Sequence, residues 1–283
     1  MRRFRWSVVI AAALVGLAAP GAVAAPPPAP AENATGWYLA MGDSLAAGYQ
    51  PGQGDDRTGG YVGGVLDAVQ VSAPKTRLTN LACSGETVVT MVSGGRCAYE
   101  EGSQLAEALV FLRAHRDTTR LVTIDIGAND VQRCVNRATL AIDLACVQSG
   151  LGDVARLLPQ VLAQLRAAAP DAQIVVLNYY NAFLAAWLAG ASGQAVAQQS
   201  GPLLALLNGI IAGAAASVEA DVADVATAFH TTDWTLVNVP ALGGQVPTNV
   251  ATICAWTWMC TVGDIHANDT GYAVMATTVA AKL

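Results

Sequence analysis

The sequence predicts an α/β domain with a mainly parallel sheet, and three observations support this fold class. Short apolar runs alternate along the chain with longer segments of helical periodicity. The run at 173–178 is almost continuously apolar, as expected for a strand covered on both faces. Polar turns follow the runs at 37–41 and 121–126. Because ligands in such sheets bind beyond the carboxyl ends of the strands, both turns are expected on the same functional edge.

The first half of the chain supplies three predicted strands. The run at 37–41 stops at Gly42-Asp43-Ser44, and the run at 121–126 stops at Gly127-Ala128-Asn129-Asp130. Leucine and alanine at 105, 108, 109 and 112 are spaced i, i+3, i+4 and i+7, which predicts a helix. In order, the expected elements are a strand at 37–41, an irregular loop at 50–64, a helix ending at 71, a strand at 77–82, a helix around 105–112 and a strand at 121–126.

The second half begins with an excursion at 133–147 that cysteines bracket. The strongest amphipathic pattern follows at 154–165, and Pro159 within it is expected to kink or break the helix. The remaining expected elements are a strand at 173–178, an apolar connection at 179–190, a helix at 203–216, a strand at 220–225 and a final helix at 271–283.

The N-terminus has the features of an export signal. Three arginines among the first five residues precede an apolar stretch, and Ala22-Val23-Ala24 forms a small-residue cleavage site. We therefore expect a cleaved signal peptide at 1–24, a Pro/Ala-rich linker at 25–35, a single domain at 36–283, and secretion to the extracellular space. A retained membrane anchor is the alternative, which the shortness of the apolar stretch disfavours.

The chain of 283 residues has a formal net charge of −6. Cleavage of the signal would leave twelve basic and twenty-one acidic side chains, a net charge of −9. An acidic chain without a run of Lys or Arg argues against a nucleic-acid partner.

Six cysteines in an exported chain indicate disulfides. Six cysteines allow 15 pairings, among which sequence alone cannot choose. Sequential pairing closes the shortest loops and is the arrangement we expect: Cys83–Cys97, Cys134–Cys146 and Cys254–Cys260. No CxxC pair or clustered Cys/His set indicates a metal, and the Gly-rich stretches lack the nucleotide-binding patterns. No metal, nucleotide or flavin cofactor is expected.

Ser44 is a candidate nucleophile, because a strand that ends in a tight turn exposes its serine hydroxyl. The alternative is that Asp43 and Ser44 only cap a helix. A nucleophilic serine needs a base, and the chain has three histidines. His115 lies in a charged helix end that is expected to face solvent. His266, in a polar loop before the final helix, is the first candidate, and His230 is the second.

Four sequence blocks together resemble the SGNH (GDSL) hydrolase family, over residues 42–272. The blocks are Gly42-Asp43-Ser44-Leu45, Gly85, Gly127-Ala128-Asn129-Asp130 and Asp264-Ile265-His266, in the order and spacing of that family. The resemblance implies the SGNH-hydrolase fold, a three-layer α/β/α sandwich with a mainly parallel, flavodoxin-like sheet of five strands. The six cysteines resemble the secreted, three-disulfide branch that contains esterases and a phospholipase A1. The absence of a GxSxG motif disfavours an ordinary α/β-hydrolase lipase.

The resemblance also implies roles for individual residues. Ser44 would attack the ester carbonyl while His266 takes its proton, giving an acyl-enzyme that water hydrolyses. The backbone N–H groups of Ser44 and Gly85 and the side-chain amide of Asn129 would form the oxyanion hole. Each of these has a structural alternative: Gly85 as a turn glycine, and Asn129 as a helix cap.

The sequence departs from the family at the third member of the triad. The usual acid stands three residues before the histidine, where this chain has Gly263. Asp264 stands only two residues before His266. Either Asp264 reaches the histidine, or a backbone carbonyl of this turn orients the ring. The resemblance to the disulfide branch favours the second arrangement, a Ser–His dyad.

The expected function is a secreted carboxylic-ester hydrolase, an esterase or lipase with phospholipase A1-like character. The alternatives are a carbohydrate O-deacetylase of the same family and a non-catalytic, disulfide-stapled surface module. The apolar segment 179–188 is either an acyl pocket or a buried helix. Trp256 and Trp258 either contact an interface near His266 or pack over the core. We expect a monomer that acts on a small-molecule or lipid ester, with transient contact to a lipid surface.

Overall fold

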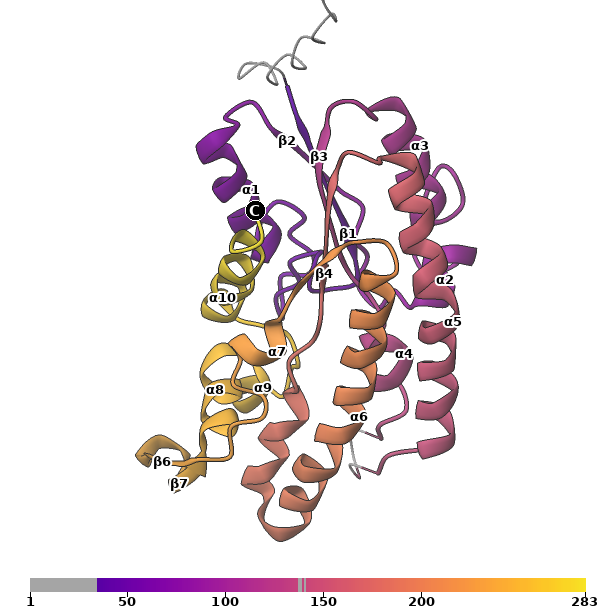
Figure 1. The fold of residues 1–283 in the computed structure, drawn as a ribbon. Coiled ribbons are helices and arrows are strands. Elements are labelled where there is room, and N and C mark those ends of the chain that lie inside the picture. Colours follow the sequence, from indigo (N-terminus) through magenta and orange to yellow (C-terminus); the bar gives the residue numbers. More distant parts are fainter. Residues whose placement is uncertain (1–34, 137–138, 140) are drawn as a thin grey trace, which may run out of the picture. The chain divides into compact units, whose positions relative to one another are not determined.

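Five parallel strands form the central sheet, in the order β2-β1-β3-β4-β5 (Figure 1). They are β1 (Trp37–Gly42), β2 (Arg77–Asn80), β3 (Thr119–Asp125), β4 (Gln173–Leu177) and β5 (Asp221–Ala223). Strand β1 lies between β2 and β3, and its last residue, Gly42, pairs in register with Asp125 at the end of β3. The predicted five-stranded parallel sheet is confirmed, and the turns after β1 and β3 leave it at one edge.

The computed structural model describes residues 35–136, 139 and 141–283. The chain divides into the units Met1–Ala31 and Glu32–Leu283, and all described residues belong to the second. The expected signal peptide and all but the last residue of the expected linker therefore lie outside the described residues.

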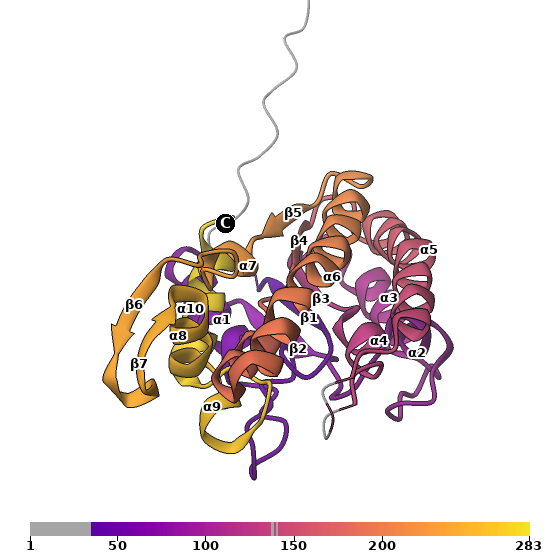
Figure 2. The same cartoon turned by 90° about the horizontal axis from the view of Figure 1, so that it is seen from below.

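Helices cover both faces of the sheet, which gives the three layers seen end-on in Figure 2. Helices α1 (Gly60–Ser72) and α10 (Asp269–Ala280) pack against each other on one face. Helices α3 (Gln104–Ala114), α5 (Leu144–Ala168) and α6 (Gly190–Ala216) cover the other. The buried apolar side chains of the strands and of these helices form one continuous core.

Several short elements lie at the edge at which the strands end. The sequence pattern did not predict them, apart from the buried helix given as one alternative for 179–188. They are α2 (Val88–Ser93), α4 (Ala128–Gln132), the 3₁₀ helix η1 (Ala182–Ala189), α7 (Val225–Ala228), the hairpin of β6 (Leu236–Val239) and β7 (Gly244–Pro247) with the 3₁₀ turn η2 (Pro240–Leu242) between them, α8 (Thr248–Trp256) and α9 (Met259–Val262). With three to nine residues each, such elements are too short to show a clear period.

Of the predicted kink or break at Pro159, the break does not occur, because α5 continues through it. Proline removes one N–H and costs roughly 3 kcal/mol inside a helix. Helix α5 offsets that cost with an apolar stripe that is buried along its length, including Val154, Leu158 and Leu162. Helix α6 also passes a proline, Pro202, and starts well before the predicted 203.

Ala182–Ala216, the combined span of η1 and α6, is long and apolar enough to cross a membrane by length and composition alone. Gly190, with a φ of 76°, separates the two helices, and they pack side by side. Helix α6 also packs on α5.

The disulfides join Cys83 to Cys97, Cys134 to Cys146 and Cys254 to Cys260. This is the sequential pairing. The first bridge closes the loop that carries Gly85, and the third lies just before His266. Two of the three therefore constrain segments that hold candidate site residues.

Truncation of Leu162 tests the packing of α5. The side chain is fully buried, so Leu162→Ala is expected to lower the free energy of unfolding by about 2–5 kcal/mol. Its matched control is Gln164→Ala on the exposed face of the same helix, expected within about 0.5 kcal/mol of wild type. Urea unfolding followed by circular dichroism measures both. Equal values for the two variants would contradict the assigned packing.

Candidate active site

The turn after β1 is held by buried polar contacts. Gly42, at a φ of 135°, lies so close to Asp125 that a Cβ there would collide with the Asp125 carbonyl oxygen. The side chain of Gln104 accepts a hydrogen bond from the Gly42 N–H at 2.7 Å and donates one to the Gly42 carbonyl at 3.0 Å. The sheet therefore fixes the backbone directly before Asp43 and Ser44.

Asp43 braces the same turn from within. Its N–H donates to the Asp125 carbonyl at 3.0 Å, and its Oδ1 accepts from the Leu45 N–H at 2.9 Å. Its Oδ2 accepts from the Tyr179 hydroxyl at 2.8 Å. Asp43 is thus fully engaged in holding the turn, and Ser44 alone presents its side chain to the site.

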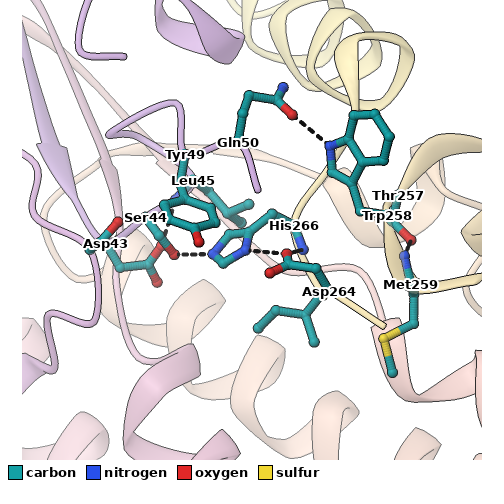
Figure 3. Close-up of polar contacts among 12 residues, drawn as sticks. Asp43, Ser44, Leu45, Tyr49, Gln50, Thr257, Trp258, Met259, Asp264 and His266 are labelled. Carbon is teal, nitrogen blue, oxygen red and sulfur yellow. Dashed lines mark hydrogen bonds and ion pairs between the residues drawn. The ribbon is translucent and has the colours of Figure 1, made fainter. Parts of the chain in front are cut away.

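Ser44, His266 and Asp264 form one line of hydrogen bonds (Figure 3). Ser44 Oγ lies 2.7 Å from His266 Nε2, and His266 Nδ1 lies 2.6 Å from Asp264 Oδ1. The Ser44 side chain is mostly buried, while His266 and Asp264 keep 14% and 24% of their side-chain surfaces exposed. The structure thus joins residues 222 positions apart in the chain.

The Asp264 carboxylate contacts the His266 ring, which differs from the favoured expectation that a backbone carbonyl orients it. Asp264 Oδ1 also accepts a hydrogen bond from the His266 backbone N–H at 3.0 Å. This is an Asx turn, in which an Asp side chain folds back over the residue two positions later. Gly263, at a φ of 71°, begins the turn. The Asx turn explains how an acid two positions before the histidine reaches the ring.

Three aromatic residues that the motifs did not single out support the histidine loop. The Tyr49 ring packs on the His266 imidazole with centroids 4.4 Å apart. The Tyr180 hydroxyl donates to the Ile265 carbonyl at 2.8 Å, and the backbone N–H of Trp258 donates to the His266 carbonyl at 3.0 Å. Tyr49 lies just beyond the Ser44 motif, and Tyr180 lies just after β4. Both positions therefore follow segments that the sequence places at this edge of the sheet.

The other two histidines lie away from Ser44. The His115 ring packs against Trp37 and Phe111, with ring centroids 4.6 Å from each, and is half-buried within an otherwise exposed helix end. His230 is exposed, in a left-handed conformation at a φ of 53°. Its ring centroid lies 6.1 Å from that of Trp256.

Both candidate tryptophans pack within the fold. Trp256 packs edge-on against Phe229, and Trp258 Nε1 donates to Gln50 Oε1 at 2.5 Å.

Gly85 and Asn129 line one hollow beside Ser44. Within the described part of the chain, neither the Ser44 N–H nor the Gly85 N–H donates a hydrogen bond. Asn129 Nδ2 donates to the Glu86 carbonyl at 2.9 Å, which leaves its second N–H available and ties it to the residue after Gly85. Asn129 lines both the pocket of Ser44 and the hollow of Gly85, and each of the three expected donors has a free N–H among the described residues.

A buried acidic pair lies beneath the nucleophile turn. Burial, together with the charge of Asp43, raises the pKa of the Asp125 carboxyl well above its usual range, and burial raises the pKa of Asp43 as well. The Tyr61 hydroxyl donates to Asp125 Oδ1 at 2.6 Å. Two buried carboxylates this close disfavour double ionisation, so the pair holds a proton when the surface carboxyls have lost theirs.

An apolar cavity adjoins the site. Its walls come from η1, from α6 and from the segment that follows β4, and include Phe183, Leu203, Leu204 and Leu207. It shares Ala128, Gln132, Tyr179 and Tyr180 with the pocket that contains Ser44 and His266. The segment 179–188 therefore combines both expectations, since Tyr179, Ala182 and Leu184 are buried and part of it lines a cavity. No group of three or more His, Cys, Asp or Glu side chains among the described residues is arranged to hold a metal ion.

Comparison with known proteins identifies the family. The profile of the GDSL-like Lipase/Acylhydrolase family matches residues 40–274. Similar solved structures include a protein of Parabacteroides merdae assigned as a GDSL-like lipase, at 16% identity and a TM-score of 0.54, covering 87% of this chain and 94% of that one. Phospholipase A1 of Streptomyces albidoflavus aligns at 22% identity and a TM-score of 0.52, over 88% and 100%. A sequence search of curated proteins gave no match.

These findings define the protein as an ester hydrolase with a three-layer α/β/α fold. The chain belongs to the GDSL-like lipase/acylhydrolase family, whose profile covers most of its length. The family resemblance stated from the sequence is confirmed.

Asp130 provides a test of the electrostatics next to the site. Its Oδ2 accepts a hydrogen bond from the Val88 N–H at 3.0 Å, and burial raises its pKa to about 6. A carboxyl whose pKa is raised by folding stabilises the fold fully below its unfolded pKa, and this contribution is lost as pH rises through the folded pKa. Asp130→Asn is therefore expected to gain about 2 kcal/mol relative to wild type between about pH 4 and pH 7. Denaturant unfolding at several pH values measures the difference, and parallel stability curves would contradict this assignment.

Proposed function

We propose that this protein is an exported carboxylic-ester hydrolase, an esterase or lipase that forms an acyl-enzyme on Ser44. The observation that carries the proposal is the line from Ser44 Oγ through the His266 ring to Asp264 Oδ1, with links of 2.7 and 2.6 Å. A serine hydroxyl is a weak nucleophile until a base accepts its proton, and an imidazole held by a carboxylate is such a base.

The reaction begins when His266 Nε2 accepts the Ser44 proton as Oγ attacks the ester carbonyl. Asp264 holds the Nδ1–H tautomer and stabilises the imidazolium that forms. The imidazolium then donates its proton to the departing alcohol oxygen, which leaves the acyl group on Ser44. Water attacks this acyl-enzyme by the same route and releases the acid.

As Ser44 attacks, negative charge develops on the carbonyl oxygen, and three hydrogen-bond donors stabilise it. They are the Ser44 N–H, the Gly85 N–H and the Asn129 side-chain amide. Their availability within the described chain supports this role. Preorganised donors of this kind contribute because they need no rearrangement when charge develops, and loss of one costs about 2.7–4 kcal/mol of barrier height.

The apolar cavity beside Ser44 supports an acyl chain rather than an acetyl group as the preferred acid part. Phospholipase A1-like action belongs within this proposal. The three disulfides and the basic–apolar N-terminal pattern support export. We also propose that the protein acts as a monomer and touches lipid surfaces only transiently.

Substitutions in the hydrogen-bonded line test the mechanism. Ser44→Ala and His266→Ala are expected to lower kcat on a chromogenic ester by about 10⁴-fold or more, because each removes the nucleophile or its base. Asp264→Asn is expected to lower kcat by about 10²–10⁴-fold, because an amide stabilises the wrong tautomer. Circular dichroism confirms folding of each variant.

The matched control is Asp269→Asn, a nearby carboxyl that accepts a hydrogen bond from Gln50 Nε2. Its kcat is expected within about twofold of wild type, as for a surface substitution. Wild-type rates in Ser44→Ala would indicate a non-catalytic surface module. Wild-type rates in Asp264→Asn would remove Asp264 from the mechanism and restore the dyad.

Chain-length preference tests the acyl cavity. Leu204→Trp places a larger side chain in the cavity wall. The ratio of kcat/KM for an octanoyl ester to that for an acetyl ester is therefore expected to fall about tenfold. Ala205→Trp, at the next and exposed position of α6, is expected to leave that ratio unchanged. A wild-type preference for acetyl esters would favour the O-deacetylase alternative.

A further inference from the structure

Two arginines line a hollow that adjoins the candidate oxyanion hole. We call it the arginine hollow and define it by Gly85, Arg96, Asn129, Gln132 and Arg133, which line it. Gly85 and Asn129 are two of the three assigned oxyanion donors. Gln132 lines this hollow, the pocket of Ser44 and the apolar cavity, so the three spaces meet at its side chain.

The position of Arg96 is fixed by its surroundings. Its Nε donates to the Ser84 carbonyl at 2.9 Å, and the next residue, Cys97, is bonded to Cys83. The guanidinium lies directly against Gly85, where an added Cβ would collide with it. A disulfide and a hydrogen bond therefore hold the Arg96 charge beside the Gly85 N–H, with its two Nη groups unpaired among the described residues.

Neither arginine of the hollow forms a salt bridge in the described part of the chain, although the charge of Arg96 acts at a distance on Glu86 and that of Arg133 on Asp130. Within the described residues, no Asp or Glu oxygen lies within 4.0 Å of the Arg96 or Arg133 guanidinium. The nearby carboxyls are buried and bonded elsewhere. Glu86 Oε2 accepts from Gln104 Nε2 at 3.1 Å, and Asp130 Oδ2 accepts from the Val88 N–H. Two exposed arginines without a salt bridge at one hollow are unusual in a chain with a net charge of −6.

We propose that the arginine hollow binds an anionic group, such as a phosphate, on the alcohol arm of the ester while the apolar cavity takes the acyl chain. This inference rests on the proposed function and extends it to a substrate class, amphiphilic esters with one apolar and one anionic arm. Guanidinium groups bind phosphate and carboxylate oxygens through paired, charge-assisted hydrogen bonds. A substrate lying across Gln132 would reach both spaces with its ester at Ser44.

A different role for Arg96 would be to stabilise the oxyanion itself through its charge. That role would accelerate every ester equally, because the oxyanion forms with each. Selectivity between charged and neutral esters therefore separates the two roles, whereas the rate on one ester does not.

The test compares monooctanoylglycerol with octanoyl-lysophosphatidic acid, which differ only in the phosphate, both below their critical micelle concentrations. Wild type is expected to show a kcat/KM about tenfold higher for the phosphate ester. The double variant Arg96→Gln/Arg133→Gln is expected to lose this preference and to keep its rate on the neutral ester. Added salt is expected to slow only the phosphate ester, because exposed charges are screened. Arg120→Gln is the matched control, because Arg120 is exposed at the start of β3, at the end of the sheet away from the site.

Hydrolysis of p-nitrophenyl octanoate, with Ser44→Ala as its blank, reports the proposed function separately. A wild-type ratio of kcat/KM between the phosphate ester and the neutral ester near one would overturn the arginine hollow. Failure to cleave either glycerol ester would overturn it as well. Both results leave the proposed function intact. An equal loss on both glycerol esters in the double variant would also overturn it, in favour of the oxyanion role. If the double variant does not fold, Arg133→Gln and the salt dependence of wild type decide the question.

Discussion

The structure of the site depends on the close approach of β1 and β3 at Gly42 and Asp125. Only a glycine can lie where Gly42 does, because a Cβ would collide with the Asp125 carbonyl. Gln104 from α3 and Tyr179 from the end of β4 then bond the turn from two further directions. Four segments thus fix the nucleophile turn: β1, β3, α3 and the residues after β4. The free-energy cost of burying its polar groups is offset by the hydrogen bonds among them. Function and core share the same contacts at this point.

The histidine loop is organised differently, by local turns rather than by the sheet. The Asx turn of Asp264 sets the ring from one side, and Tyr49 packs against it from the neighbourhood of Ser44. Trp258 bonds the loop backbone and the side chain of Gln50, so the two halves of the site are linked by more than the Ser44–His266 contact. A loop held in this way positions the ring before any ester binds, which is the condition for efficient proton transfer.

Much of the fold and of the site could be predicted from the sequence. The parallel sheet follows from apolar runs alternating with periodic helices. Ser44 follows β1, Asn129 lies in the short helix α4 after β3, and His266 precedes α10. The orientation of Asp264 could not be predicted, because it depends on one side-chain rotamer in an Asx turn rather than on spacing. The continuation of α5 through Pro159 could not be predicted either, because burial of the helix outweighs the local rule. Arg96 and Arg133 form no pattern in the sequence, since only the Cys83–Cys97 loop and the end of α4 bring them together.

The central claim is that Ser44 is a nucleophile activated by His266. The most direct measurement is labelling of the folded protein with a serine-directed fluorophosphonate, read by intact mass and by peptide mapping. We expect one adduct per chain, located on Ser44, and a labelling rate lower by about 10³-fold or more in His266→Ala. Absence of an adduct on the folded wild type, or an adduct on another serine such as Ser84, would contradict it.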